Sequence, residues 1–180
     1  MKATGIVRRI DELGRVVIPK EIRRTQRIRQ GDTLEIFTAA DGEVVFKKYS
    51  PLVELGQLAD IYAEVLAKNL GRPVLVCDRA RITAAAGAGR ADLLGRDISA
   101  EVEQVLAGRA VYTAPEDPGQ RTRLFERGER QLLCAAPIVV RGDVEGGVLL
   151  PGTARDAAPG EEAAQPVGMA ASFLARWMEG

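Results

Sequence analysis

Short runs of apolar residues, separated by polar turns, make up the first fifty positions of the chain. Four runs favour β-strands, at residues 5–10, 15–19, 33–39 and 43–49. The first two flank the polar turn DELG, and the last two flank Asp41-Gly42, a pair typical of tight hairpins. Pro19 suits the first position of a helix, so PKEIRRTQR predicts a short helix over residues 19–27. The predicted order is strand, strand, short helix, strand, strand.

A unit of about fifty residues encloses little interior. This one has no disulfide to compensate, because both cysteines of the chain lie beyond residue 50. We therefore expect it to share its core with a second copy of the chain. Interleaved strands from two chains would bury apolar side chains of the first two runs, namely Ile6, Val7, Val16, Val17 and Ile18.

The pattern changes after residue 50. Ser50 and Pro51 are suited to cap and begin a helix, and Gly71 is suited to end it. An apolar stripe with near-heptad spacing connects them, formed by Leu55, Leu58, Ala59, Tyr62, Val65, Leu66 and Leu70. The stripe is interpreted equally well as a helix packed on its own domain or as a helix paired across a dimer.

From residue 72 onward the pattern mixes strands and helices. Strands are predicted at 72–78, 81–87, 110–114, 130–140 and 144–152, and helices at 98–108 and 160–178. Pro166 predicts a kink in the last helix or marks its true start. The expected fold class is α+β, with domain boundaries giving residues 1–50, a linker helix over 51–71, and residues 72–180.

The distribution of charge is more informative than its total. The formal net charge is zero, yet residues 1–29 contain nine Lys and Arg against three Asp and Glu, while residues 51–180 contain fourteen against eighteen. A basic amino-terminal segment followed by an acidic remainder is typical of a nucleic-acid-binding module joined to another domain. In the predicted helix, four cations share one face at spacings of three and four residues: Lys20, Arg23, Arg24 and Arg27. The alternative interpretation of this stripe is an ordinary solvated helix face.

The composition offers little for catalysis or metal binding. The chain has no histidine, and Cys77 and Cys134 lie in apolar runs where we expect buried, reduced thiols. Glu116 and Asp117 are adjacent carboxylates in a proline-flanked loop, where solvation is expected. We expect neither an enzyme nor a cofactor. The sequence lacks a signal-peptide core and an apolar run of membrane-spanning length, so a cytoplasmic location is expected.

The stretch TGIVRRIDELGRVVIPKEIRRT resembles the amino-terminal domain of the AbrB-type bacterial transition-state regulators, and the resemblance continues through GDTLEIF and DGEVVFKKY. It implies a swapped-hairpin β-barrel dimer that presents arginines to double-stranded DNA. The DNA-contacting arginines of that family match Arg8, Arg15, Arg23 and Arg24, with Arg9 and Lys20 as expected helpers. A planar guanidinium can hold a phosphate or the edge of a guanine with two hydrogen bonds.

One position departs from the family pattern. Gln26 stands where an apolar residue is usual, which concerns the packing at the helix end rather than the DNA-binding face. A dimer carries two copies of every arginine, so we expect DNA affinity to fall steeply as salt rises. A surface that reads the shape of DNA predicts degenerate, A/T-tolerant sites.

The layout of residues 72–180 resembles a GAF domain, a module that commonly binds small molecules between its sheet and the covering helices. The segment 110–130 is interpreted as a mobile lid or as an ordinary surface loop, and the ligand-binding residues are unknown. With its ending FLARWME, the whole chain resembles the regulators of spore development in this family. The resemblance implies a nucleoid-associated transcription regulator that activates or represses by promoter. Its second domain would sense a small molecule and join dimers into homotetramers.

An antitoxin-like protein that neutralises a protein partner is the alternative, because antitoxins share this amino-terminal fold. Antitoxins normally carry a disordered partner-binding tail, whereas residues 72–180 have the pattern of a folded domain. The glycine-rich sequence AAAGAGRADLLG has neither the GK[ST] ending of a phosphate-binding loop nor its spacing, and it predicts no nucleotide site.

Overall fold

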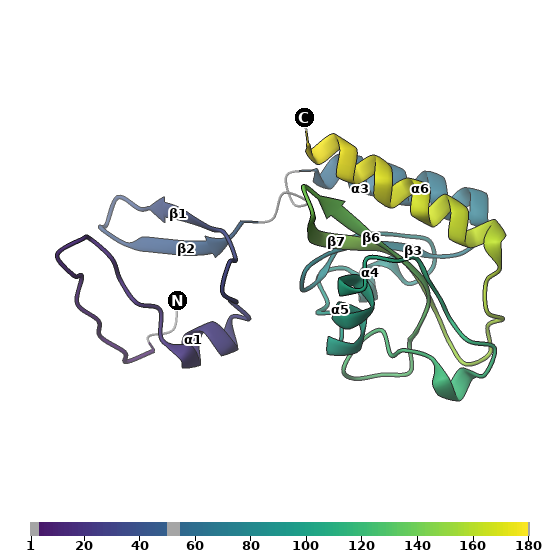
Figure 1. The fold of residues 1–180 in the computed structure, drawn as a ribbon, viewed down its shortest axis with the longest axis horizontal. Helices are drawn as coiled ribbons and strands as arrows, with labels where there is room; N and C mark the ends of the chain where they lie inside the picture. The colour runs from purple at the N-terminus through teal and green to yellow at the C-terminus, as the bar shows by residue number, and fades with distance from the viewer. Residues whose placement is uncertain (1–3, 50–54, 180) are drawn as a thin grey trace. The chain divides into compact units, whose positions relative to one another are not determined.

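The computed structural model describes residues 4–49 and 55–179. The chain divides into two compact units, Met1–Tyr49 and Ser50–Gly180, which we call the amino-terminal and carboxy-terminal units (Figure 1). The described part of the amino-terminal unit has three regular elements, α1 (Lys20–Thr25), β1 (Leu34–Thr38) and β2 (Val44–Lys48). Because their packing encloses very little, only Pro19 is buried among residues 4–49.

β1 and β2 form the hairpin that the sequence predicts. They pair antiparallel, with Leu34 opposite Lys48 and Thr38 opposite Val44. The turn is closed by the amide of Gly42, which donates to the carbonyl of Ala39 at 3.1 Å. Gly42 has φ of 84°, a left-handed conformation that glycine adopts without strain. The prediction of a tight turn at Asp41-Gly42 is therefore confirmed.

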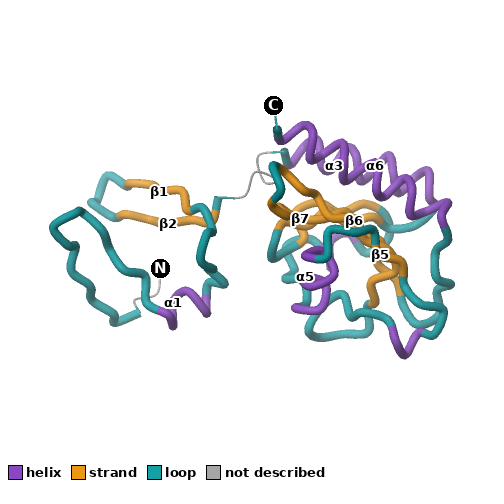
Figure 2. Tube along the Cα trace, in the orientation of Figure 1, coloured by secondary structure: helices purple, strands orange, loops and turns teal. Residues whose placement is uncertain are grey.

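The two strands predicted at residues 5–10 and 15–19 are not strands in the single chain. Figure 2 shows this stretch as loop, and its regular hydrogen bonds are confined to the intervening turn. There the amide of Asp11 donates to the carbonyl of Arg15 at 3.0 Å, and the amide of Gly14 donates to that of Asp11 at 2.9 Å. A β-strand requires a hydrogen-bonded neighbour, and one chain supplies none for these runs.

The short helix is real but ends earlier than predicted. It begins at Lys20, with Pro19 just before it, and ends at Thr25. Arg27 lies beyond the end with φ of 52°, so it leaves the basic stripe. The following turn is tied to β2, because Lys48 donates to the carbonyl of Arg27 and pairs with Asp32 at 3.0 Å.

The carboxy-terminal unit is built on a five-stranded antiparallel sheet with the order β4-β3-β7-β6-β5. Its strands are β3 (Val74–Asp78), β4 (Ile82–Ala86), β5 (Tyr112–Thr113), β6 (Gln131–Val140) and β7 (Asp143–Gly152). Two helices lie side by side on one face, and two shorter helices lie on the other (Figure 1). The first pair is α3 (Gly56–Leu70) and α6 (Glu161–Met178), and the second is α4 (Arg90–Leu93) and α5 (Ala100–Ala107).

Both faces of this sheet carry buried apolar side chains. The layer under α3 and α6 includes Ala59, Leu66 and Leu174, whereas the layer under α4 and α5 includes Leu93 and Val102. Because two separate layers of apolar side chains are buried from solvent, this unit has the substantial core that the amino-terminal unit lacks.

Local signals set the helix ends of the carboxy-terminal unit. Gly71 ends α3 in the left-handed conformation, with φ of 63°, as predicted. The expected cap at Ser50 and Pro51 lies outside the described residues. The hydroxyl of Ser99 accepts from the amide of Val102 at 3.2 Å and so begins α5. α6 begins at Glu161 and includes Pro166, which is therefore not its start.

Candidate nucleic-acid interface

All six cations predicted to bind DNA are exposed on the amino-terminal unit. They are Arg8, Arg9, Arg15, Lys20, Arg23 and Arg24. Among the described residues, only Arg15 of this set forms an ion pair with a carboxylate. The other five positive charges are therefore not neutralised by acids of the described chain, as a phosphate-binding surface requires.

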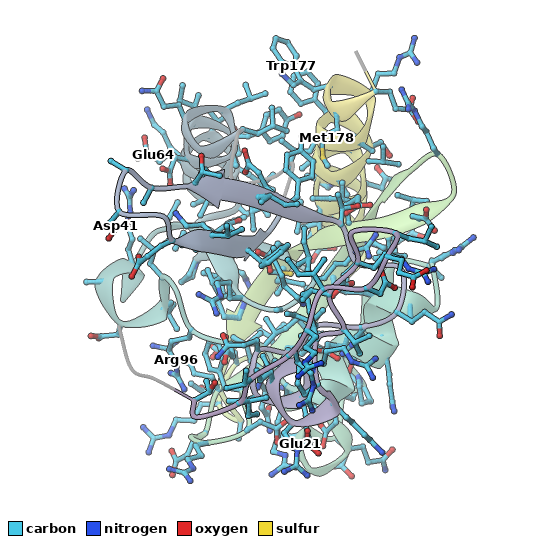
Figure 3. The ribbon with its side chains drawn as sticks, turned by 90° about the vertical axis from the view of Figure 1, so that its left-hand side faces the viewer. Glu21, Asp41, Glu64, Arg96, Trp177 and Met178 are labelled. Atoms are coloured by element: carbon cyan, nitrogen blue, oxygen red, sulfur yellow. The ribbon has the colours of Figure 1, made fainter. Side chains whose placement is uncertain are left out.

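α1 supplies three of these cations on one side of a short helix. Arg23 and Arg24 follow Lys20 by three and four residues, and both lie in the last turn. Cations in this turn are favoured by the negative end of the helix dipole. Glu21, labelled in Figure 3, occupies the first turn, where the dipole favours an acid. The sequence of α1 therefore satisfies helix electrostatics while it leaves basic side chains exposed.

The turn before α1 holds Arg15 in place. Asp11 Oδ1 accepts hydrogen bonds from the amides of Leu13 at 3.0 Å and of Arg15 at 2.8 Å. Asp11 Oδ2 accepts from Arg15 Nε at 2.8 Å. The backbone and side-chain hydrogen bonds from Arg15 lower the pKa of Asp11 below its usual range, so this carboxylate is ionised at neutral pH. The charge and hydrophobic patterns of the sequence did not predict this network.

A cleft of about 560 Å³ opens in the amino-terminal unit. Its lining is mostly apolar and includes Ile6, Ile22 of α1 and residues 16–19 and 43–46, together with Arg8. Several of the apolar residues in this region are highly exposed, with Val17 at 72% and Val44 at 56%. The same cleft is lined by Gln26, the residue that departs from the family pattern.

The carboxy-terminal unit exposes a second apolar surface, which we call the α3/α6 face. Its members are spaced by four residues along each helix: Ile61 and Val65 on α3, and Met169, Phe173 and Trp177 on α6. Phe173 stacks on Tyr62 with ring centroids 4.9 Å apart, which joins the two helices. Trp177 is 58% exposed and projects outward from α6 in Figure 3. The inner side of α3 packs on its own sheet, while Ile61 and Val65 are left in solvent.

The segment 110–130 is tied down rather than loose. Arg121 is only 7% exposed, and its guanidinium donates four hydrogen bonds to backbone carbonyls. The acceptors are Pro115, Glu116, Thr153 and Asp156. These contacts attach the turn around the 3₁₀ helix η1 (Pro118–Gln120) to the connection between β7 and α6. The structure therefore favours an ordered surface loop over a mobile lid.

The cysteines are buried, as the apolar runs around them predicted. Burial raises the pKa of Cys77 far above its usual value and raises that of Cys134 to about 11. Among residues 4–49 and 55–179, no group of three or more His, Cys, Asp or Glu side chains is arranged to hold a metal ion. None of the helices in these two stretches combines the length and the apolar character that a membrane crossing requires.

Two family models match different parts of the chain. One, described as stage V sporulation protein T C-terminal, transcription factor, matches residues 54–179. The other, described as antidote-toxin recognition MazE, bacterial antitoxin, matches residues 7–52. Stage V sporulation protein T of Bacillus subtilis (strain 168) is 47% identical over 181 residues, which are 99% of each chain. Transition state regulatory protein AbrB of the same organism is 59% identical over 51 residues, 28% of this chain and 52% of AbrB.

A solved structure supports the fold of the carboxy-terminal unit. The GAF domain/HD domain protein from Geobacter sulfurreducens has a TM-score of 0.51 and 18% identity, covering 69% of this chain and 91% of that one. At this identity the likeness concerns the fold alone. The expected α+β class, with an AbrB-like beginning and a GAF-like remainder, is confirmed.

Proposed function

The chain belongs to the stage V sporulation protein T family of transcription factors, and we propose that it regulates sporulation genes by binding double-stranded DNA as a homo-oligomer. It would activate some promoters and repress others. The observation that carries the proposal is the state of residues 4–19 in the single chain, which carry three arginines, form no strand and have no strand partner among the described residues. A second copy of the chain would supply that partner.

Dimerisation is supported by the apolar side chains that the amino-terminal unit leaves in water. Val7 is 84% exposed, and Ile10 and Val17 are each at least 70% exposed. Strands exchanged between two chains would pair their backbone groups and cover the cleft near Val44. Such a swapped-hairpin barrel would give both chains the interior that neither has alone.

DNA binding is supported by the positive charge that remains outside such a barrel. A dimer doubles Arg8, Arg15, Arg23 and Arg24, with Arg9 and Lys20 beside them. Arginine holds phosphate with two parallel hydrogen bonds, and each phosphate contact releases counterions from the DNA. We expect these six residues to form the DNA surface.

The test is fluorescence anisotropy of labelled promoter DNA over a series of salt concentrations. We expect R8A, R15A and R23A each to weaken binding and to make the salt dependence shallower. R127A is a matched control, since Arg127 is an exposed arginine of the carboxy-terminal unit. If the three variants bind like R127A, the assignment of the DNA surface is wrong.

Assembly beyond the dimer is supported by the α3/α6 face. Five exposed apolar side chains lie on two adjacent helices, and a second copy of the same face would cover them. We expect sedimentation to give a tetramer for the full chain and a dimer for the double variant M169D/W177D. A tetramer that survives both substitutions would place the contact elsewhere.

The GAF-like unit is also proposed to bind a small molecule, on the basis of its fold. The alternative function, neutralisation of a protein partner, is favoured by the MazE model that matches residues 7–52. Limited proteolysis of the carboxy-terminal part distinguishes a folded sensory domain from a tail that binds a protein partner. A resistant fragment that begins near residue 55 supports a sensory and assembly domain, whereas rapid loss of that part supports a partner-binding tail.

A further inference from the structure

The contact between Asp11 and Arg15 uses only one edge of the guanidinium. Arg15 Nε is 2.8 Å from Asp11 Oδ2, and within the described residues neither Nη1 nor Nη2 forms a hydrogen bond or ion pair. The other carboxylate oxygen is bound to the turn itself, through the amides of Leu13 and Arg15. The Arg15 side chain remains 70% exposed, so its terminal nitrogens are accessible.

The backbone prevents the turn from releasing this carboxylate easily. Gly14 has φ of 74°, which brings the amide of Arg15 back toward the Asp11 side chain. The carbonyl of Arg15 accepts from the amide of Asp11 at 3.0 Å, so the two residues are joined by three hydrogen bonds in all. Asp11 therefore fixes both the backbone position of Arg15 and the orientation of its guanidinium plane.

We propose that Asp11 is a positioning residue for DNA binding, which holds Arg15 by its Nε edge in the free protein and presents the Nη1 and Nη2 atoms to DNA. The inference rests on the proposed function. A free arginine loses rotamer freedom when it is fixed on a ligand, and a side chain that is already fixed loses less. The two terminal nitrogens are sufficient for a bidentate contact with a phosphate or with the edge of a guanine.

Positioning can be separated from charge, because the two effects of Asp11 on DNA affinity have opposite signs. As a negative charge beside phosphates, Asp11 weakens binding, so its neutralisation alone would strengthen binding. As a positioning residue it strengthens binding, so loss of its contact with Arg15 would weaken it. Glu12 provides the matched control, because it is an exposed acid of the same turn without a hydrogen bond or ion pair to any described residue.

The variants are D11N and E12Q of the full chain. Asparagine retains Oδ1, which can still accept from the amides of Leu13 and Arg15, but its Nδ2 cannot accept from Arg15 Nε. Both variants lose one negative charge from the turn. In anisotropy titrations we expect D11N to bind promoter DNA about two- to tenfold more weakly than E12Q, as expected for the loss of one preorganised side chain per chain.

R15A and the double variant D11N/R15A complete a double-mutant cycle, and circular dichroism and sedimentation verify that each variant folds and associates. We expect D11N to weaken binding in the wild-type background and to have no weakening effect once Arg15 is absent. If R15A weakens binding while D11N binds like E12Q, the positioning role is wrong and the DNA surface stands. If D11N weakens binding equally with and without Arg15, Asp11 acts through the turn alone and the proposal fails. If R15A binds like the wild type, Arg15 has no part in DNA binding, and both the assignment and this inference fail.

Discussion

Replacing Arg121 with methionine tests whether the segment 110–130 is tethered. Methionine has a similar reach and suits a buried position, but it cannot donate the four hydrogen bonds of the guanidinium. The carbonyls of Pro115, Glu116, Thr153 and Asp156 would lose this donor together. The substitution therefore removes the attachment of the loop around η1 and preserves most of the packed volume.

The geometry gives the size of the effect. Two of the four hydrogen bonds are short, at 2.9 Å to Pro115 and 2.8 Å to Asp156, and the other two are 3.1 and 3.4 Å long. A hydrogen bond from a charged donor contributes about 1.5 kcal/mol or more in net terms, so the two short ones give about 3 kcal/mol. For a domain of this size, that loss lowers the melting temperature by roughly 10 °C.

Thermal unfolding followed by tryptophan fluorescence measures this loss, because Trp177 is the only tryptophan and lies in the carboxy-terminal unit. R127M is the control, since Arg127 is exposed in the same segment and we expect a change below about 0.5 kcal/mol. Protein concentration is held constant, because association contributes to stability. A melting temperature for R121M that matches R127M would refute the tether and reopen the interpretation of 110–130 as a lid.

Three further outcomes are expected. G152A should destabilise the carboxy-terminal unit in urea unfolding, because a Cβ at this position would lie 2.3 Å from a methyl carbon of Leu133. Cys77 and Cys134 should resist alkylation at pH 8 until the protein is unfolded, since both thiols are buried and their pKa values are raised, to about 11 for Cys134. Hydrogen bonds from the hydroxyl and from the amide of Thr153 lower the pKa of Asp156. Its contribution to stability is therefore present above the unfolded-state pKa of about 4 and is lost as pH falls through the folded-state pKa, so acid titration of D156N should show a smaller loss.

The sequence predicts those elements whose determinants are local. The hairpin at Asp41-Gly42 and the end of α3 at Gly71 are predicted because a glycine with positive φ specifies each of them. The strands at 5–10 and 15–19 have the right composition but require a partner that a single chain does not provide. α4 was missed because a helix of four residues within a glycine-rich loop has no measurable periodicity.

The candidate site, too, has some features that the local sequence predicts and others that it does not. Exposure of the six cations could be predicted, because arginine and lysine are rarely buried and this run contains too few acids to pair them all. The role of Arg121 could not be predicted, since its local sequence is as charged as that of the exposed Arg123 and Arg127. The Asp11 network does have a sequence signal, because an Asp followed three residues later by Gly is typical of a turn in which the carboxylate binds backbone amides.

The uneven distribution of buried surface implies that the two units depend differently on association. Residues 4–49 bury only Pro19, so we expect their folding to depend on association, whereas the carboxy-terminal unit has two apolar layers within one chain. Contact through the α3/α6 face would join two swapped dimers and hold their DNA surfaces at a high effective concentration for neighbouring DNA sites. We therefore expect the full chain to bind DNA at protein concentrations at which dimers of residues 4–49 alone bind only weakly. A ligand that altered the α3/α6 face would change DNA affinity without touching an arginine, because the two sites would be linked through the same association equilibrium.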